Sequence, residues 1–195
     1  MTTINTPNPI LHKAIAKGNL KSVQFWIKKG ENIETKNSDG QTALHYAASV
    51  NRLQIVEFLL ENGAKIEEKD KKGHTPLHFA VSKGFQLIVE VLIKYDANLE
   101  ARHGTHLKTP LHITAEKGLT EIAQMLISKG AQINAKSSIG ITPLWLAAFH
   151  GQNLILDILL QNGTNIEAET NFGTTPLYAA CGSFFDCAKV VKKIS

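Results

Sequence analysis

The sequence is poor in cysteine, in arginine and in long apolar runs. Two cysteines among 195 residues are too few for a disulfide framework, which favours a reducing compartment. No stretch approaches the roughly 18 uncharged apolar residues of a membrane-spanning helix, so we expect no part of the chain in a membrane. Residues 1–11 lack a basic cluster followed by an apolar run, and we expect no secretory signal.

Positive charge is absent from one long segment. Residues 137–188 contain no Lys or Arg, and Arg52 and Arg102 are the only arginines in the chain. The net charge of +4 is too small to identify a partner by itself. Hydrophobic residues make up 43% of the chain, which is too many for a disordered protein.

A short motif recurs along the chain. Four of its five clear copies read Thr-Pro-Leu followed by His, Trp or Tyr, and one reads Thr-Ala-Leu-His; they begin at Thr42, Thr75, Thr109, Thr142 and Thr175. The steps between them are 33, 34, 33 and 33 residues, and Pro9-Ile10-Leu11-His12 begins 33 residues before Thr42. Six units therefore cover nearly everything from Pro9 to the end of the sequence.

Each unit is predicted to contain two helices and three turns. Thirteen of the 14 glycines fall into three positions of the period, and glycine favours turns with positive φ. Thr followed by Pro is a strong signal for a helix start. Apolar residues then follow at helical spacing, first as in Leu44, Ala47 and Ala48 and again over residues 55–60. One such pair cannot bury its own apolar face, so the units must stack.

The motif Thr-Pro-Leu-His-x-Ala, with Gly-Ala-x-Ile-x-Ala after the second helix, resembles the ankyrin repeat. The resemblance covers about 95% of the chain. It implies an all-α repeat solenoid of stacked helix-turn-helix units joined by short β-hairpin fingers. It also implies a protein-binding scaffold whose concave face is lined by the finger tips and the ends of the first helices.

The ends of the array have the polar substitutions expected of caps. Lys13 and Ser22 replace apolar residues of the other units, and Lys192 does so in the last unit. We therefore predict a short flexible lead over residues 1–8 and a single domain over residues 9–195. The six units are expected at residues 9–41, 42–74, 75–108, 109–141, 142–174 and 175–195. Apolar bulk at Phe184, Phe185, Val191 and Ile194 leaves the C-terminal cap less complete.

The recurring histidines are predicted to be structural. They are His12, His45, His78 and His112. Equivalent residues of stacked units lie roughly 8–10 Å apart, whereas one zinc ion needs its nitrogens within roughly 2.1 Å. The resemblance implies that each ring hydrogen-bonds the motif threonine and the neighbouring finger. Trp145 and Tyr178 replace this histidine in the last two units, and we expect repacking with loss of the bridge. Cys181 and Cys187 are predicted to be small buried residues.

The connection over residues 102–108 is one residue longer than the other fingers. A tolerated loop insertion explains it most simply. Two alternatives remain: a metal site made by His103 and His106 with His74, and an altered finger tip that contacts a partner.

The candidate partner-binding residues follow from the concave face that the resemblance implies. In the last two units this face carries apolar or aromatic side chains, at Ile139, Ile141, Phe149, His150 and Phe172. Earlier units place polar residues there, and the candidates are Lys71, Lys72, His74, His103 and His106. Exposed aromatic residues commonly anchor interfaces, but these residues could equally support the C-terminal cap.

The sequence predicts a non-catalytic scaffold that binds a protein or peptide and acts as a monomer in the cytoplasm. No phosphate-binding loop, metal signature or nucleophile arrangement is visible, so we expect no enzyme activity and no cofactor. One alternative is a basic scaffold associated with nucleic acid, which the scarcity of arginine disfavours. Another is an effector or adaptor of an intracellular bacterium in the host cytosol, suggested by the excess of lysine, isoleucine and asparagine.

Overall fold

The computed structural model describes residues 9–182 and 192–193. These residues divide into two compact units at the bond between Asn98 and Leu99. Unit 1 contains α1 (Ile10–Ala16), α2 (Leu20–Lys28), α3 (Ala43–Ser49), α4 (Leu53–Glu61), α5 (Pro76–Lys83) and α6 (Gln86–Lys94). Unit 2 contains α7 (Pro110–Lys117), α8 (Thr120–Ser128), α9 (Pro143–Phe149), α10 (Asn153–Gln161) and α11 (Pro176–Gly182).

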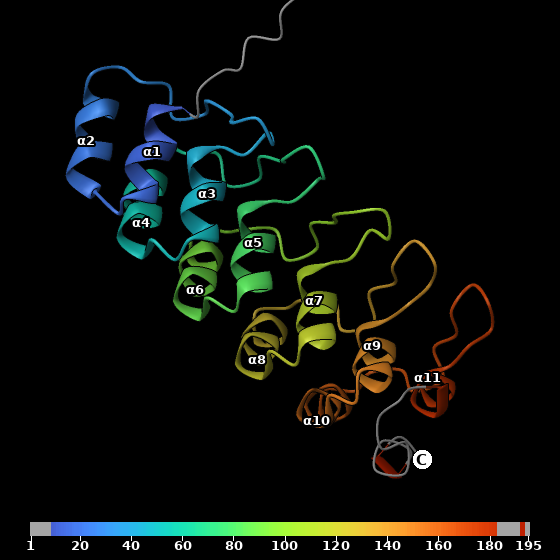
Figure 1. Cartoon of the computed structure of the whole chain (residues 1–195). Coiled ribbons are helices and arrows are strands. Elements are labelled where there is room, and N and C mark those ends of the chain that lie inside the picture. The colour runs from blue at the N-terminus through green and yellow to red at the C-terminus, as the bar shows by residue number, and fades with distance from the viewer. Residues whose placement is uncertain (1–8, 183–191, 194–195) are drawn as a thin grey trace, which may run out of the picture. The chain divides into compact units, whose positions relative to one another are not determined.

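Within each unit the helices form two rows. In unit 1, α1, α3 and α5 pack side by side in one row and α2, α4 and α6 in the other (Figure 1). In unit 2, α7, α9 and α11 form the first row, and α8 packs against α10 in the second. The all-α repeat fold predicted from the sequence is confirmed. That residues 9–195 form a single domain stays a prediction, as does the capping role of the first and last repeats. The expected flexible lead lies outside the described residues.

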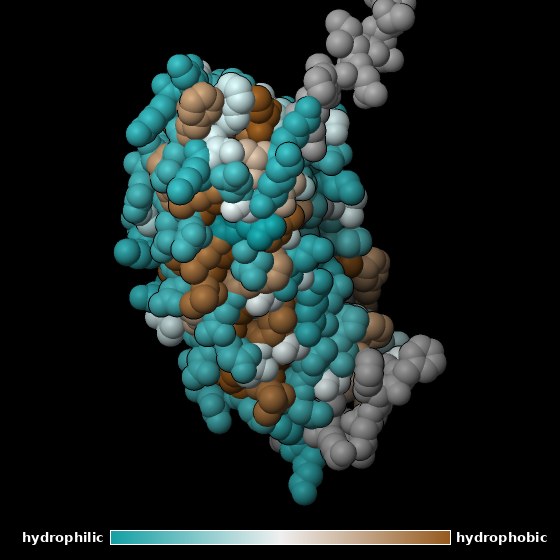
Figure 2. Space-filling view, turned by 60° about the vertical axis from the view of Figure 1, so that its left-hand side comes forward, coloured by the Kyte–Doolittle hydropathy of each residue, from teal (hydrophilic) through white to brown (hydrophobic). Residues whose placement is uncertain are grey.

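The apolar residues that define the helical pattern form the core. Leu44, Ala47 and Ala48 of α3 are at most 1% exposed, and residues 55–60 of α4 contribute Ile55, Val56, Leu59 and Leu60. Large apolar side chains on the second helices are exposed only singly, as at Leu87 and Leu154. The face shown in Figure 2 is mostly hydrophilic with small apolar patches between. Among the described residues, no helix is long and apolar enough to cross a bilayer.

Two turns at helix ends lack the glycine that their repeat position normally carries. Gly84 and Gly118 end α5 and α7 in the left-handed conformation. The equivalent residue after α3 is Asn51, with φ of 57°, and Asp96 takes a φ of 62° after α6. Asn and Asp are the residues besides glycine that adopt this conformation most readily, so the turns are retained without glycine.

The fingers are tight turns held by the side chain of their first residue. The Asn37 side chain accepts the N–H groups of Asp39 and Gln41, and Asp70 and Thr170 hold their fingers in the same way. The predicted hairpins are therefore very short. Over residues 9–182, only the longer finger has a reciprocal antiparallel bridge, between His103 and Lys108.

Candidate functional site

A threonine and a histidine together cap the first helix of the central repeats. The Thr42 N–H donates to His45 Nδ1 at 3.2 Å, and the Thr42 hydroxyl lies 2.8 Å from the same nitrogen. His45 Nε2 lies 3.0 Å from the backbone carbonyl oxygen of His74 in the next finger and must carry the proton that it donates. The same cap forms between Thr75 and His78 and between Thr109 and His112.

These imidazoles are buried. Burial lowers the pKa of His45 below its usual value and that of His112 to about 4. His112 Nε2 is also occupied, 2.9 Å from the Ile141 carbonyl oxygen. Both nitrogens of the His45 and His112 rings therefore serve the fold, and the structural role that the resemblance implied is confirmed for these residues. Among the described residues, no group of three or more His, Cys, Asp or Glu side chains could hold a metal ion.

The first repeat lacks half of this cap. His12 Nε2 lies 2.9 Å from the Gln41 carbonyl oxygen, but its buried Nδ1 has no hydrogen-bond partner. The reason is Pro9, which stands where the other repeats have threonine and offers neither an N–H nor a hydroxyl. Pro9 has φ of −49° and ψ of 147°, an extended conformation that threonine can also adopt.

We expect Pro9→Thr with Ile10→Pro to restore the missing cap. This variant should be about 1 kcal/mol more stable than the matched variant Pro9→Ala with Ile10→Pro, because only threonine adds a hydroxyl beside His12 Nδ1. Urea denaturation of the two double variants measures the difference. Equal stability would mean that the hydroxyl does not reach the histidine.

Trp145 keeps the connection to the next finger. Its replacement of the motif histidine was expected to break that connection. Its indole Nε1–H donates to the Thr174 hydroxyl at 3.2 Å, across the same 29-residue separation as the histidine bonds. The predicted repacking is therefore correct, and the predicted loss of the bridge is wrong. The indole donor is long enough to reach a side-chain oxygen of the finger in place of its backbone.

An aromatic surface lies at the end of α9. The Trp145 and Phe149 rings are stacked, with centroids 5.2 Å apart and 14° between their planes, and His150 meets Phe149 edge-on at 5.1 Å. Phe149 is 36% exposed and Phe172, at the tip of the next finger, is 76% exposed. We call these aromatic residues of unit 2, Trp145, Phe149 and His150 at the end of α9 and Phe172 at the finger tip, the aromatic face.

The two candidate isoleucines contribute less to this surface. Ile139 and Ile141 are half-buried, and their carbonyl oxygens accept bonds from the Asn171 N–H and from His112. Their side chains are therefore less accessible to a partner than those of Phe149 and Phe172. Binding by any of these residues stays a prediction.

In unit 1 the polar candidates differ from one another. Lys71 and Lys72 are exposed. His74 is half-buried, and its Nδ1 lies 3.1 Å from an Asp70 carboxylate oxygen. Burial raises the pKa of Asp70, but the N–H groups of His74 and Lys72 outweigh it and hold this pKa below its usual value. The two lysines are thus available for contacts, whereas His74 already stabilises its own finger.

The longer finger absorbs its extra residue in the turn. Leu107 occupies the position that is glycine in the other fingers and takes a φ of 51°. His103 is half-buried beside its bridge to Lys108, and His106 is exposed. The His106 carbonyl oxygen accepts the Ser138 N–H at 2.9 Å. Both histidines lie in unit 2 and His74 in unit 1, and the described residues supply no metal-ligand set at this finger.

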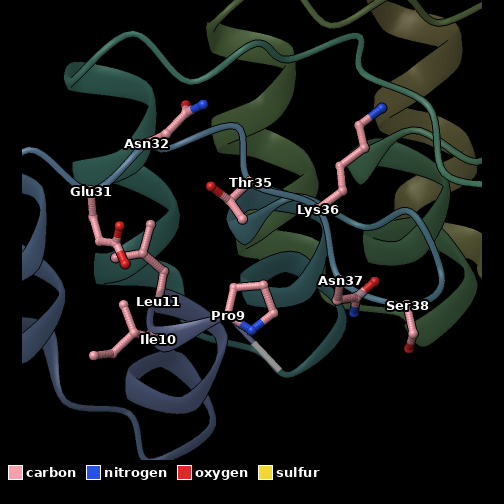
Figure 3. Close-up of a pocket in the computed structure, with 9 residues that line it drawn as sticks. All are labelled: Pro9, Ile10, Leu11, Glu31, Asn32, Thr35, Lys36, Asn37 and Ser38. Carbon is pink, nitrogen blue, oxygen red and sulfur yellow. The ribbon is translucent and has the colours of Figure 1, made fainter. Parts of the chain in front are cut away.

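An open pocket of about 360 Å³ lies at the start of α1 (Figure 3). Pro9, Ile10 and Leu11 form its apolar side, and residues of the first finger form its polar side. The two titratable side chains that line it are Glu31 and Lys36, and Lys36 forms an ion pair with Glu68 at 2.7 Å. The described residues that line the pocket include no nucleophile–base pair.

Cys181 is exposed on α11, so the prediction that it is buried is wrong. The equivalent residues of the earlier first helices, such as Ala115 and Ala148, are buried. The prediction for Cys187, and the apolar bulk expected at Phe184, Phe185, Val191 and Ile194, concern residues outside the described part of the chain.

Comparison with known proteins identifies the repeats. No curated protein matches the sequence. A solved structure of a predatory endopeptidase from Bdellovibrio bacteriovorus in complex with an immunity protein contains a chain that is 27% identical, with a TM-score of 0.86. The match covers 95% of this chain and 96% of that one. A family profile described as ankyrin repeats, in three copies, matches residues 3–70, 65–137 and 111–194. This chain therefore belongs to the ankyrin repeat family.

Proposed function

We propose that this protein is a non-catalytic module that binds a partner protein through the aromatic face. The observation that carries the proposal is the exposure of Phe149 and Phe172, which both lie in chain segments without charged residues. Residues 137–156 contain no Asp, Glu, Lys or Arg, and neither do residues 170–182. Exposed aromatic side chains with no charges among them are typical of the anchor of an interface.

The similarity to a chain from a complex supports a protein partner. That structure joins an endopeptidase to an immunity protein, and its similar chain matches this one over nearly the full length of both. The polar residues of the repeat motif already cap helices and hold fingers, which leaves them unavailable for catalysis. A repeat scaffold fixes the shape of a surface and leaves the identity of its partner to the exposed residues.

The apolar anchor should contribute more to binding than the lysines of unit 1. Phe149→Ala and Phe172→Ala should each weaken partner binding about tenfold or more, because each removes a large apolar contact. Lys71→Ala should change it by less than about threefold, because an exposed charge is well solvated. Partners are captured from cell extract on the wild-type protein, identified and purified, and then titrated against each variant.

Two results would contradict this assignment. Equal losses for the phenylalanine and lysine variants would remove the aromatic face as the anchor. Binding to duplex DNA or RNA with steep salt dependence would favour the nucleic-acid alternative. A role in the host cytosol of an intracellular bacterium remains a second candidate, supported only by the composition of the chain.

A further inference from the structure

Each finger is tied to the preceding repeat by a hydrogen bond that recurs with the period. An acceptor side chain takes the backbone N–H of a residue 31 or 32 positions later, at 2.7–2.8 Å. The pairs are Glu34 with Lys65, Glu67 with Asn98, Glu100 with Gln132, and Asn134 with Asn165. Glu167 occupies this acceptor position in the last finger. It is exposed, and no residue of the described part of the chain donates to its carboxylate.

A backbone bond between finger tips recurs in the same way. Lys71 N–H donates to the Asp39 carbonyl oxygen at 3.1 Å, and Asn171 N–H donates to the Ile139 carbonyl oxygen at 3.1 Å. The next acceptor in this series is the carbonyl oxygen of Phe172. Within residues 9–182 and 192–193, no N–H donates to it. The outer edge of the last finger therefore presents two acceptors in the spacing that earlier fingers use to hold a neighbouring chain segment.

A third recurring contact is made by a basic side chain in earlier fingers, whereas the last finger has an acidic residue at the equivalent position. Lys36, Arg102 and Lys136 each donate a side-chain N–H to a backbone carbonyl oxygen of the following finger, at 2.8–3.1 Å. The equivalent residue of the last finger is Glu169, which is exposed. A carboxylate can only accept a hydrogen bond. The residue that approaches this position must therefore bring a donor, and a cationic side chain fits best.

The aromatic residue of the motif completes the edge. His12, His45, His112 and Trp145 each reach the next finger, and Tyr178 is their equivalent in the last repeat. Tyr178 is 65% exposed, beside Leu177 at 38%. We call Glu167, Glu169, the Phe172 carbonyl group and Tyr178 the terminal edge. The two carboxylates and the carbonyl group are acceptors, the Tyr178 hydroxyl can donate, and the exposed Leu177 side chain adds an apolar contact beside them.

We propose that the terminal edge binds an extended segment of a partner protein that donates backbone N–H groups and carries a lysine or arginine. Residues 137–188 contain no Lys or Arg, and neither glutamate forms an ion pair with a described residue. A basic segment therefore supplies an ion-pair partner for these two carboxylates, while its backbone pairs as a further finger would. The proposal rests on the protein-binding function proposed above but uses a surface separate from Phe149.

A displayed library of random 16-residue peptides, selected on the 195-residue protein, tests the terminal edge. Enriched peptides should share basic and apolar residues. Their affinity should fall at least about tenfold in Glu167→Lys with Glu169→Lys. It should stay within about twofold in Glu61→Lys with Glu90→Lys, which makes the same change of net charge at exposed helix positions. Replacing one peptide amide by an ester removes a single N–H donor and should weaken binding up to about tenfold.

Each other outcome overturns the proposal. Failure to enrich peptides, acidic consensus peptides, or an ester scan without effect would show that the edge does not pair in this way. A concentration-dependent mass in light scattering that disappears in the glutamate variant would make a second copy the occupant. Peptides that lose affinity in Phe149→Ala but not in the glutamate variant would support the aromatic face alone, which separates the two proposals. Circular dichroism and thermal unfolding check that every variant is folded.

Discussion

Replacing Gly140 by alanine should lower the free energy of unfolding by about 3 kcal/mol. Gly140 turns the finger that precedes α9, with a φ of 80°, and an L-residue with this backbone costs about 1–2 kcal/mol. The added Cβ would also lie 2.7 Å from the Asn171 backbone nitrogen and 2.9 Å from the Thr170 Cα. These are backbone atoms of the next finger, so the clash is relieved only by moving that finger, at a further cost of about 1–3 kcal/mol.

Gly163→Ala is the matched control. Gly163 has a similar φ of 75°, but a Cβ there would meet nothing within 4 Å. Its free energy of unfolding should fall only by the cost of placing an L-residue at positive φ, about 1–2 kcal/mol. Urea denaturation of both variants and the wild type gives the difference. Equal losses would contradict the close contact between the two fingers, and with it the bond from the Asn171 N–H to the Ile139 carbonyl oxygen.

The helical framework could be predicted because its signals are local. The Thr-Pro cap, the apolar spacing and the turn residues each lie within one repeat, and each is confirmed, for example in α5 and α7. The substitutes Asn51 and Asp96 could have been found by aligning the first five repeats, because each is the only residue other than glycine at its position there. The sequence therefore contained nearly everything needed to place the helices.

Contacts between fingers were harder to predict, because they depend on which atom the neighbouring finger presents. The replacement of histidine by Trp145 was visible, but the Thr174 hydroxyl that accepts its N–H was not a motif residue. In a similar way, the sequence did not reveal that His74, a candidate for partner binding, pairs with Asp70 of its own finger. At the terminal edge, the change from Lys136 to Glu169 could be read from the repeats. The consequence of this change could be seen only in the structure, which shows that the Lys136 side chain donates to a backbone carbonyl oxygen of the next finger.

Acidification from pH 7.5 to pH 5 should remove about 2 kcal/mol of stability through His112 alone. The unfolded histidine has a pKa of about 6.5, whereas burial lowers the folded pKa to about 4. Between these values the unfolded state binds more protons than the folded state, so stability falls as the pH falls. Burial lowers the pKa values of His12 and His45 in the same direction, and these residues add to the loss.

The chosen pH range separates the histidines from the carboxylates. The pKa of Asp70 lies below its usual value, so the stability that this carboxylate contributes is lost only as the pH falls below about 4. His112→Gln should be less stable than the wild type at pH 7.5, because glutamine cannot make both the Thr109 and the Ile141 contacts. Its free energy of unfolding should also fall by about 2 kcal/mol less on acidification to pH 5, because glutamine at position 112 does not titrate in this pH range. Urea denaturation of both proteins at the two pH values measures this double difference. An identical pH dependence would mean that His112 is not held neutral between its cap and the next finger, and that the finger is fixed by packing alone.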